Sequence, residues 1–260
     1  MLLLVLCATL LGAKSAPPEV VFLHVFPVSI DDSLPAGSIE LELNRDVKTF
    51  GELTRRRIAR RVDTRRLRVT LGDYPLSRDR PVRRYRACSF LIDCDEPIVR
   101  ELGQRIREEI GANADLPALT SWVRHYITRP NHSRGFDLAS VVARRRVGDC
   151  SEHSVLLAAM ARLHGHATRV VLGLVLVGLS GHPTRAFGHA WVEHHDGKRW
   201  TKADAALPLA ELERSAGAPL TVQYLPIQVI DREDAGYAAA ILDGASLIAV
   251  SGVRVPRAGK

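Results

Sequence analysis

A cysteine, a histidine and an aspartate stand where they could form a thiol-based catalytic site. Cys150 lies in Gly148-Asp-Cys-Ser-Glu-His153, directly before an apolar pattern typical of a buried helix. Asp149 is suited to cap that helix, which predicts Cys150 near the first helical position. The unpaired N–H groups and the helix dipole favour negative charge there, so we expect a lowered thiol pKa and donors for an oxyanion. A cysteine that is merely a small buried side chain would fit the same pattern.

The histidine and the aspartate belong to a predicted β-hairpin. Asp196-Gly197 separates two segments of alternating polarity and is typical of a two-residue turn. Counting outward from that turn places Asp204 directly opposite His189 on one face, and Glu193 opposite Trp200. A carboxylate beside an imidazole fixes its tautomer and stabilises its protonated form. With Cys150 as the nucleophile, the three residues predict acyl transfer from an amide through a thioester.

The elements that must position these residues run from strands to helices and back to strands. Strands are predicted at 20–26, 39–43, 168–177, 188–194 and 198–203, and helices at 96–110, 116–127, 136–144 and 149–164. This order predicts an α+β fold with segregated layers. We divide the chain into a signal peptide (1–16), a β-rich N-terminal region (17–95) and a catalytic domain (96–260).

Three motifs in this order resemble the transglutaminase-like superfamily of papain-type thiol enzymes. They are Gly148–His153, Gly188-His-Ala-Trp-Val-Glu193 and Trp200-Thr-Lys-Ala-Asp204, together with Ala158, Arg162, Gly165 and Arg169-Val-Val171. The resemblance covers about residues 96–210. It implies that Cys150 is the nucleophile, that His189 is the general base and acid, and that Asp204 orients His189. It also implies a helix carrying the cysteine, packed on an antiparallel sheet that carries the other two.

The resemblance leaves the substrate open. Members of the superfamily cross-link glutamine to amines, deamidate, cleave peptides or have lost activity. A transglutaminase-like acyltransferase, a cysteine peptidase or amidase of the cell envelope, and a non-catalytic binding module therefore remain alternatives. We expect a protein or peptide substrate and no cofactor. The side chain that completes the oxyanion hole is not evident, and Trp122 and Tyr126 are candidates.

The N-terminus and the charge bear on the compartment and the partners. The apolar run at 1–12, followed by Ala13-Lys-Ser-Ala16, predicts a signal peptide and export to the periplasm or beyond; an uncleaved anchor is the alternative. The net charge of +7 favours an anionic partner such as the cell envelope. The arginine run at 54–61 is predicted on a short helix. It lacks interleaved aromatic residues, so we expect no nucleic acid. The sequence does not predict an oligomeric state.

The remaining cysteines and histidines raise two further questions. Cys88 and Cys94 flank a strand-like Ser-Phe-Leu-Ile segment, which would hold them roughly 20 Å apart, so they can pair only if the chain turns back. A metal site is the rival to the thiol site. Its possible ligands are Cys150, His153, His164, His166, His189, His194 and His195. Cys150-x-x-His153 has no second pair at zinc-finger spacing, so we expect no metal.

Overall fold

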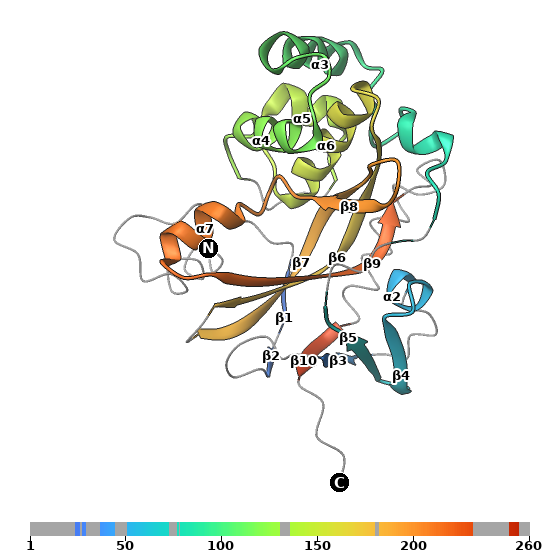
Figure 1. Ribbon diagram of the computed structural model, residues 1–260, viewed down its shortest axis with the longest axis vertical. Helices are drawn as coiled ribbons and strands as arrows, with labels where there is room; N and C mark the ends of the chain where they lie inside the picture. The colour runs from blue at the N-terminus through green and yellow to red at the C-terminus, as the bar shows by residue number, and fades with distance from the viewer. Residues whose placement is uncertain are drawn as a thin grey trace.

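The computed structural model describes residues 24–26, 28–29, 37–44, 51–72, 77, 79–130, 136–179, 182–230 and 250–254. The predicted signal peptide lies outside these residues. Helices and two sheets occupy separate layers (Figure 1), so the predicted α+β class is confirmed. Among the described residues, no helix is long and apolar enough to cross a membrane.

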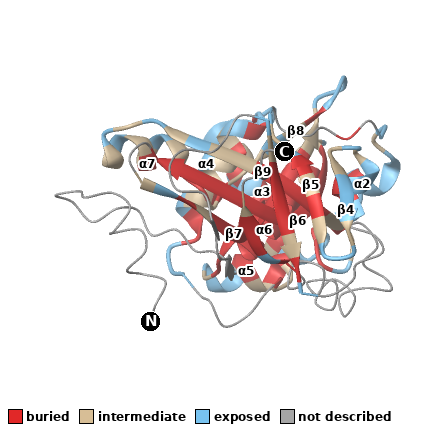
Figure 2. Ribbon diagram, turned by 90° about the horizontal axis from the view of Figure 1, so that it is seen from below, coloured by how far each residue is buried: buried red, intermediate tan, exposed pale blue. Residues whose placement is uncertain are grey.

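The first sheet carries the predicted hairpin. Its strands follow the order β1 (His24–Phe26), β7 (His182–His195), β6 (Ala167–Leu179) and β9 (Leu220–Ile230), and β8 (Trp200–Ala203) also pairs with β7. All of these pairings are antiparallel. β6 is buried along its whole length (Figure 2) because both faces of the sheet are covered. Val170 and Leu172 pack in the main core, whereas Val171 and Val175 pack in a second cluster with Trp191.

Four helices gather on one side of this sheet (Figure 1). They are α3 (Pro97–Ile110), α4 (Leu116–Tyr126), α5 (Ala139–Arg145) and α6 (Cys150–Leu163), each close to its predicted range. α5 begins three residues later than predicted. α6 is the central helix, because nearly all of its side chains are buried. A further helix, α7 (Leu209–Ala216), connects β8 to β9.

The second sheet combines both ends of the described chain. Its order is β2 (Val28–Ser29), β10 (Val250–Arg254), β3 (Ser38–Leu43), β5 (Arg66–Thr70) and β4 (Ala59–Asp63). β10 thus joins N-terminal strands, whereas β1 joins the sheet that carries the hairpin. The main core also contains residues of both sheets. The domain division at residue 95 stays a prediction. Strands from each side of that boundary join the sheet of the other side.

Two local predictions in the N-terminal region are wrong. The arginine run does not lie on one helix: α2 (Gly51–Arg55) ends within it, Arg57 adopts a φ of 59°, and the chain continues into β4. The segment between Cys88 and Cys94 is not a strand. It turns back through a hydrogen bond from Ser89 N to Ile92 O (3.1 Å), which brings the two Cα atoms to 5.1 Å and allows a disulfide.

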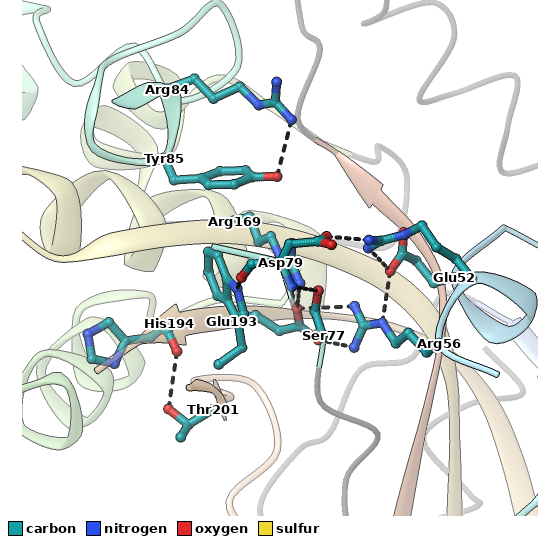
Figure 3. Close-up of polar contacts among 12 residues, drawn as sticks. Glu52, Arg56, Ser77, Asp79, Arg84, Tyr85, Arg169, Glu193, His194 and Thr201 are labelled. Carbon is teal, nitrogen blue, oxygen red and sulfur yellow. Dashed lines mark hydrogen bonds and ion pairs between the residues drawn. The ribbon is translucent and has the colours of Figure 1, made fainter. Parts of the chain in front are cut away.

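A buried ion-pair cluster joins α2 to the hairpin sheet (Figure 3). The Glu193 carboxylate, which is fully buried, accepts hydrogen bonds from Arg169 Nη2 at 2.6 Å and from Arg56 Nη1 at 2.6 Å. Arg56 Nε in turn donates to Glu52 at 2.8 Å. The Arg169 guanidinium lies 4.0 Å from the centre of the Trp200 ring. These contacts fix the strand that carries His189 against the N-terminal region.

Candidate active site

Cys150 is the first residue of α6, as predicted. The Asp149 side chain accepts a hydrogen bond from Ser151 N at 2.8 Å, and Glu152 Oε2 accepts one from Asp149 N at 2.9 Å, which together form a capping box. Residue 148 must be glycine, because a Cβ there would lie 2.2 Å from the Cβ of Glu152. The motif Gly-Asp-Cys-Ser-Glu therefore encodes the exact start of the helix that presents the thiol.

The predicted lowering of the Cys150 pKa is wrong. Burial raises the pKa of this thiol well above its usual value, and the nearby Asp149 carboxylate raises it further. A hydrogen bond with the backbone of Ala190 acts in the opposite direction without reversing the shift. The helix-start argument failed because the thiol has no contact with solvent and lies between two acidic residues, the N-cap Asp149 and Glu152 in the first turn. The resting thiol is therefore protonated and needs a base to be activated.

His189 and Asp204 are in direct contact, although the predicted register is wrong. His189 Nε2 lies 2.7 Å from Asp204 Oδ2. The loop spans Asp196 to Arg199, so His195 pairs with Trp200 and Glu193 with Lys202, a shift of two residues from the prediction. A shift of two keeps every side chain on its expected face, because side chains in a strand alternate with a period of two. The imidazole–carboxylate pair therefore survives the error in register.

The Asp204 carboxylate is held as an anion on both oxygens. Oδ2 also accepts a hydrogen bond from the Tyr224 hydroxyl at 2.8 Å, and Oδ1 accepts from Ala206 N at 2.9 Å and Leu207 N at 3.0 Å. Although burial acts to raise the pKa of Asp204, the charge of His189 and these hydrogen bonds leave it below its usual value. An anionic Asp204 accepts a hydrogen bond from Nε2, so that in the neutral tautomer of this pair the lone pair of the ring lies on Nδ1. Tyr224 lies on β9, which the sequence analysis did not predict.

The thiol meets the hairpin at Ala190, the residue that follows His189. β7 pairs with β1 up to Gly188 and with β8 from Val192 onward. Within the described part of the chain, this edge of β7 therefore carries no strand at 189–191. The N-terminus of α6 approaches β7 at this interruption, which brings Cys150 next to the backbone beside His189.

A cleft of about 250 Å³ opens beside the start of α6. Its walls include Gly148 and Asp149 before the thiol, and Ala205 and Ala206 after Asp204. The other lining residues come mainly from the end of α4 and the segment that follows it, with one residue of α6 and two at the start of α7: Arg124, His125, Ile127, Thr128, Arg129, Pro130, His153, Pro208 and Glu211. We call this hollow the substrate cleft, because it borders both halves of the candidate site.

The oxyanion-hole candidates lie elsewhere. Trp122 donates from Nε1 to Glu109 at 2.7 Å, and Tyr126 donates from its hydroxyl to Ala143 O at 2.6 Å. The two rings stack at 4.9 Å and line a separate hollow with Arg105 and Arg146. Neither lines the substrate cleft. Their polar atoms are engaged in local structure, so the prediction that either completes the site is not supported by its position.

The residues of the rival metal site are dispersed. Among the described residues, no group of three or more His, Cys, Asp or Glu side chains is arranged to hold a metal ion. His166 and His194 do meet, with their ring centres 5.0 Å apart, and His153 Nδ1 lies 2.7 Å from Asp149 O. Burial lowers the pKa of His194 to about 4. The histidines therefore serve separate local contacts.

A helix that starts at a cysteine, packed on an antiparallel sheet with an imidazole–carboxylate pair, defines a class of mixed α/β thiol proteins. Residues 100–205 match the family model of the transglutaminase-like superfamily, which confirms the resemblance inferred from the sequence. Over these residues the chain is therefore similar to the core of that superfamily. A comparison with curated proteins found no match.

A comparison with solved structures found partial similarity to proteins from three bacteria. A provisionally named cysteine protease from Cytophaga hutchinsonii is 14% identical over 77% of this chain and 86% of its own, with a TM-score of 0.41. The periplasmic domain of TgpA from Pseudomonas aeruginosa is 18% identical over 75% of each chain, also with a TM-score of 0.41. A provisionally named protease from Parabacteroides distasonis is 15% identical over 78% of this chain and 46% of its own, with a TM-score of 0.30.

Proposed function

We propose that this protein is a thiol-dependent acyltransferase that acts on amide bonds of proteins or peptides. The observation that carries the proposal is the hydrogen bond from His189 to an anionic Asp204. His189 directly precedes Ala190, the residue of β7 whose backbone contacts the Cys150 thiol. Cys150 is the nucleophile, His189 the general base and acid, and Asp204 the orienting residue. The similarity to the transglutaminase-like superfamily supports this assignment of roles.

The proposed reaction begins from a neutral thiol. His189 Nδ1 takes the thiol proton as Sγ attacks the amide carbonyl carbon, and Asp204 stabilises the imidazolium that forms. We assign the backbone N–H of Cys150 as a donor to the oxyanion, since it stands at the helix start. The C–N bond then breaks, His189 protonates the leaving amine or ammonia, and a thioester remains. An amine or water attacks the thioester and gives its proton to His189. The C–S bond then breaks, the acyl product leaves, and His189 returns the proton to the thiolate to restore the thiol.

The choice between an amine and water as acceptor rests on how well the site excludes solvent. Cys150 and His189 are both fully buried, which would protect the thioester from bulk water and supports transfer to an amine. Hydrolysis, as in a cysteine peptidase or amidase, is the alternative. A non-catalytic binding module is the other alternative, and it predicts no turnover at all.

The test uses a glutamine-containing peptide with and without a primary amine, and mass spectrometry as the readout. We expect amine-linked product, and its loss in Cys150→Ala with folding retained, since the side chain removed is small. Hydrolysed product alone would establish the peptidase or amidase alternative. Undiminished turnover by Cys150→Ala would overturn the nucleophile assignment. A failure of the wild-type protein to modify or cleave any member of a peptide library would favour the binding module.

We also propose that the protein is exported. The disulfide between Cys88 and Cys94 supports an oxidising compartment, because such bonds are rare in the reducing cytosol. The signal-peptide pattern at 1–16 supports the same conclusion. N-terminal sequencing of protein recovered from cells should find a mature chain starting near Ala16 or Pro17. An intact Met1 in a cytoplasmic fraction would contradict export, and an intact Met1 in a membrane fraction would indicate the uncleaved anchor.

A further inference from the structure

Arg124 stands out in the substrate cleft because its guanidinium is largely buried and incompletely paired. Its side chain is 22% exposed, and within the described part of the chain its Nη2 is buried without a hydrogen-bond partner. The ion pair it makes is loose, with Nε 3.7 Å from Glu211 Oε1, beyond hydrogen-bond distance. A buried N–H without a partner is costly, and native proteins keep few of them. A ligand that supplies an acceptor would remove this cost.

The position of Arg124 ties it to the catalytic centre. It lines the substrate cleft together with Asp149, which precedes the thiol, and with Ala205, which follows Asp204. Desolvation lowers the pKa of Arg124, whereas the charges of Glu211 and Asp204 act in the opposite direction. Its interaction with the Asp204 charge shows that the guanidinium lies near the proposed triad.

Two acidic residues line the cleft, Asp149 and Glu211, and the Asp149 carboxyl group already accepts hydrogen bonds from Ser151 N and Oγ. His153 lies on the first turn of α6, and its Nδ1 contacts Asp149 O at 2.7 Å. Burial lowers the pKa of His153, so this side chain is neutral in the resting cleft. Arg129 adds a second positive charge at the exposed end. Glu211, whose side chain is 40% exposed, is the group that an incoming anion must displace.

We propose that Arg124 binds a carboxylate of the substrate, so that the cleft selects an acidic peptide. This inference rests on the proposed function, because a substrate of amide chemistry is peptide-like and its anionic groups are carboxylates. The planar guanidinium matches a carboxylate with two parallel hydrogen bonds, which a lysine cannot reproduce. The carboxylate comes either from an Asp or Glu side chain or from the C-terminus of the peptide.

The experiment measures binding rather than turnover, so it does not depend on the chemistry. Three peptides are titrated into Cys150→Ala by calorimetry: acetyl-Ala-Gln-Ala-Glu-Ala amide, the same peptide with Gln in place of Glu, and that Gln peptide with a free C-terminal carboxylate. At least one of the two acidic peptides should bind about 10- to 100-fold more tightly than the neutral one, the size expected for a hydrogen bond to a charged group. Which of them does so identifies the source of the carboxylate.

Variants of the cleft should then move this preference in opposite directions. Arg124→Gln in the Cys150→Ala background should remove the preference and leave the affinity for the neutral peptide unchanged. Arg124→Lys should keep part of it, and Glu211→Gln should increase it several-fold by removing the competing carboxylate. The matched control is Arg100→Gln, an exposed arginine on α3, which should change nothing.

Two outcomes would overturn the inference. One is equal or undetectable binding of all three peptides at millimolar concentration. The other is a loss in Arg124→Gln that affects acidic and neutral peptides alike while circular dichroism shows a folded protein. If Arg124→Gln does not fold, Arg124→Lys and Glu211→Gln decide, since they predict opposite shifts. Failure of the proposed function would instead appear as turnover that persists in Cys150→Ala, or as no turnover by the wild-type protein. Neither result depends on the peptide titrations, so the two failures are distinguishable.

Discussion

The Asp204 carboxylate contacts His189 diagonally, from a position just beyond the end of β8. The paired register ends at Val192 and Ala203, so Asp204 lies beside the continuation of β7 and its Oδ2 reaches His189 Nε2 at 2.7 Å. The chain turns immediately afterwards, and the N–H groups of Ala206 and Leu207 hold Oδ1. The contact therefore depends on the turn after β8 as much as on the hairpin.

Asp204→Asn should abolish most of the activity without unfolding the protein. The amide keeps the shape of the side chain but cannot stabilise an imidazolium by charge. We expect the rate to fall by several orders of magnitude, since the equivalent change in a serine triad costs about 10⁴. The measurement is kcat/KM on the peptide of the amine-transfer assay, with circular dichroism as the folding control. A variant that retains a tenth of the wild-type rate would contradict the role of Asp204.

Tyr224→Phe should have a smaller effect through the same carboxylate. The change removes the hydroxyl that donates to Asp204 Oδ2, while His189 and two backbone N–H groups remain as donors. A hydrogen bond to a charged group contributes about 1.5–3 kcal/mol, so we expect a loss of about 10- to 100-fold in kcat with little change in KM. Tyr85→Phe is the matched control, because it also removes one tyrosine hydroxyl, which here accepts a hydrogen bond from Arg84 Nη2 at 3.3 Å. Equal losses in both variants would point to a general structural effect.

Local patterns predicted much of the fold. The start of α6 follows from Asp149 and Gly148, and the apolar run behind them has the period of a buried helix. The hairpin was predicted with the correct faces and the wrong register. Its loop has four residues, with Gly197 at a φ of 98°, whereas Asp-Gly more often marks a two-residue turn. The face was robust because only odd shifts in register exchange the two faces.

What the sequence could not predict depends on contacts between distant segments. Tyr224 reaches Asp204 from β9, and no local spacing links the two residues. The pKa of Cys150 depends on burial under the whole fold, whereas its helix position alone favours the thiolate. Cys88 and Cys94 pair because the intervening residues turn, although Ser-Phe-Leu-Ile has strand-like composition. Arg124 was not singled out, because only the folded cleft shows its unpaired N–H.

Glu152→Gln should change how the stability of the protein depends on pH. Burial and the Asp149 carboxylate raise the pKa of Glu152 from 4.5 to about 7. A carboxyl group whose folded pKa is raised contributes stability below pH 4.5 and loses it as the pH rises through about 7. A glutamine does not titrate, so relative to wild type the variant should gain about 1–3 kcal/mol between pH 5 and pH 8.

Urea unfolding at pH 5, 6, 7 and 8 measures this difference directly. Titrating groups that do not interact with residue 152 cancel in the comparison, whereas Asp149, whose carboxyl group hydrogen-bonds with Glu152, titrates together with it. Glu108→Gln, an exposed position on α3, is the control and should show a constant difference. A flat or falling difference for Glu152→Gln would show that Glu152 is ionised throughout, and the pair beside the thiol would then carry two negative charges at neutral pH.

Glu193→Gln should destabilise the protein strongly while leaving the chemistry of the folded molecules intact. Its carboxylate is the shared acceptor for Arg169 and Arg56, whose side chains are 0% and 2% exposed. Its loss removes the counter-charge between the two buried guanidinium groups, while Arg56 keeps its pair with Glu52 and Arg169 keeps a longer one with Asp79 at 3.6 Å. Removing one partner of a buried ion pair typically costs about 3–5 kcal/mol. Urea unfolding followed by tryptophan fluorescence measures the loss. Asp63→Asn is the control, because its pair with Arg66 is exposed and its loss should leave the midpoint unchanged.

Glu193 lies on β7, four residues beyond His189, and does not contact Asp204 through any of these bonds. At a temperature well below unfolding, kcat should therefore stay within a few-fold of wild type, and a loss as large as that of Asp204→Asn would place Glu193 among the residues that position His189.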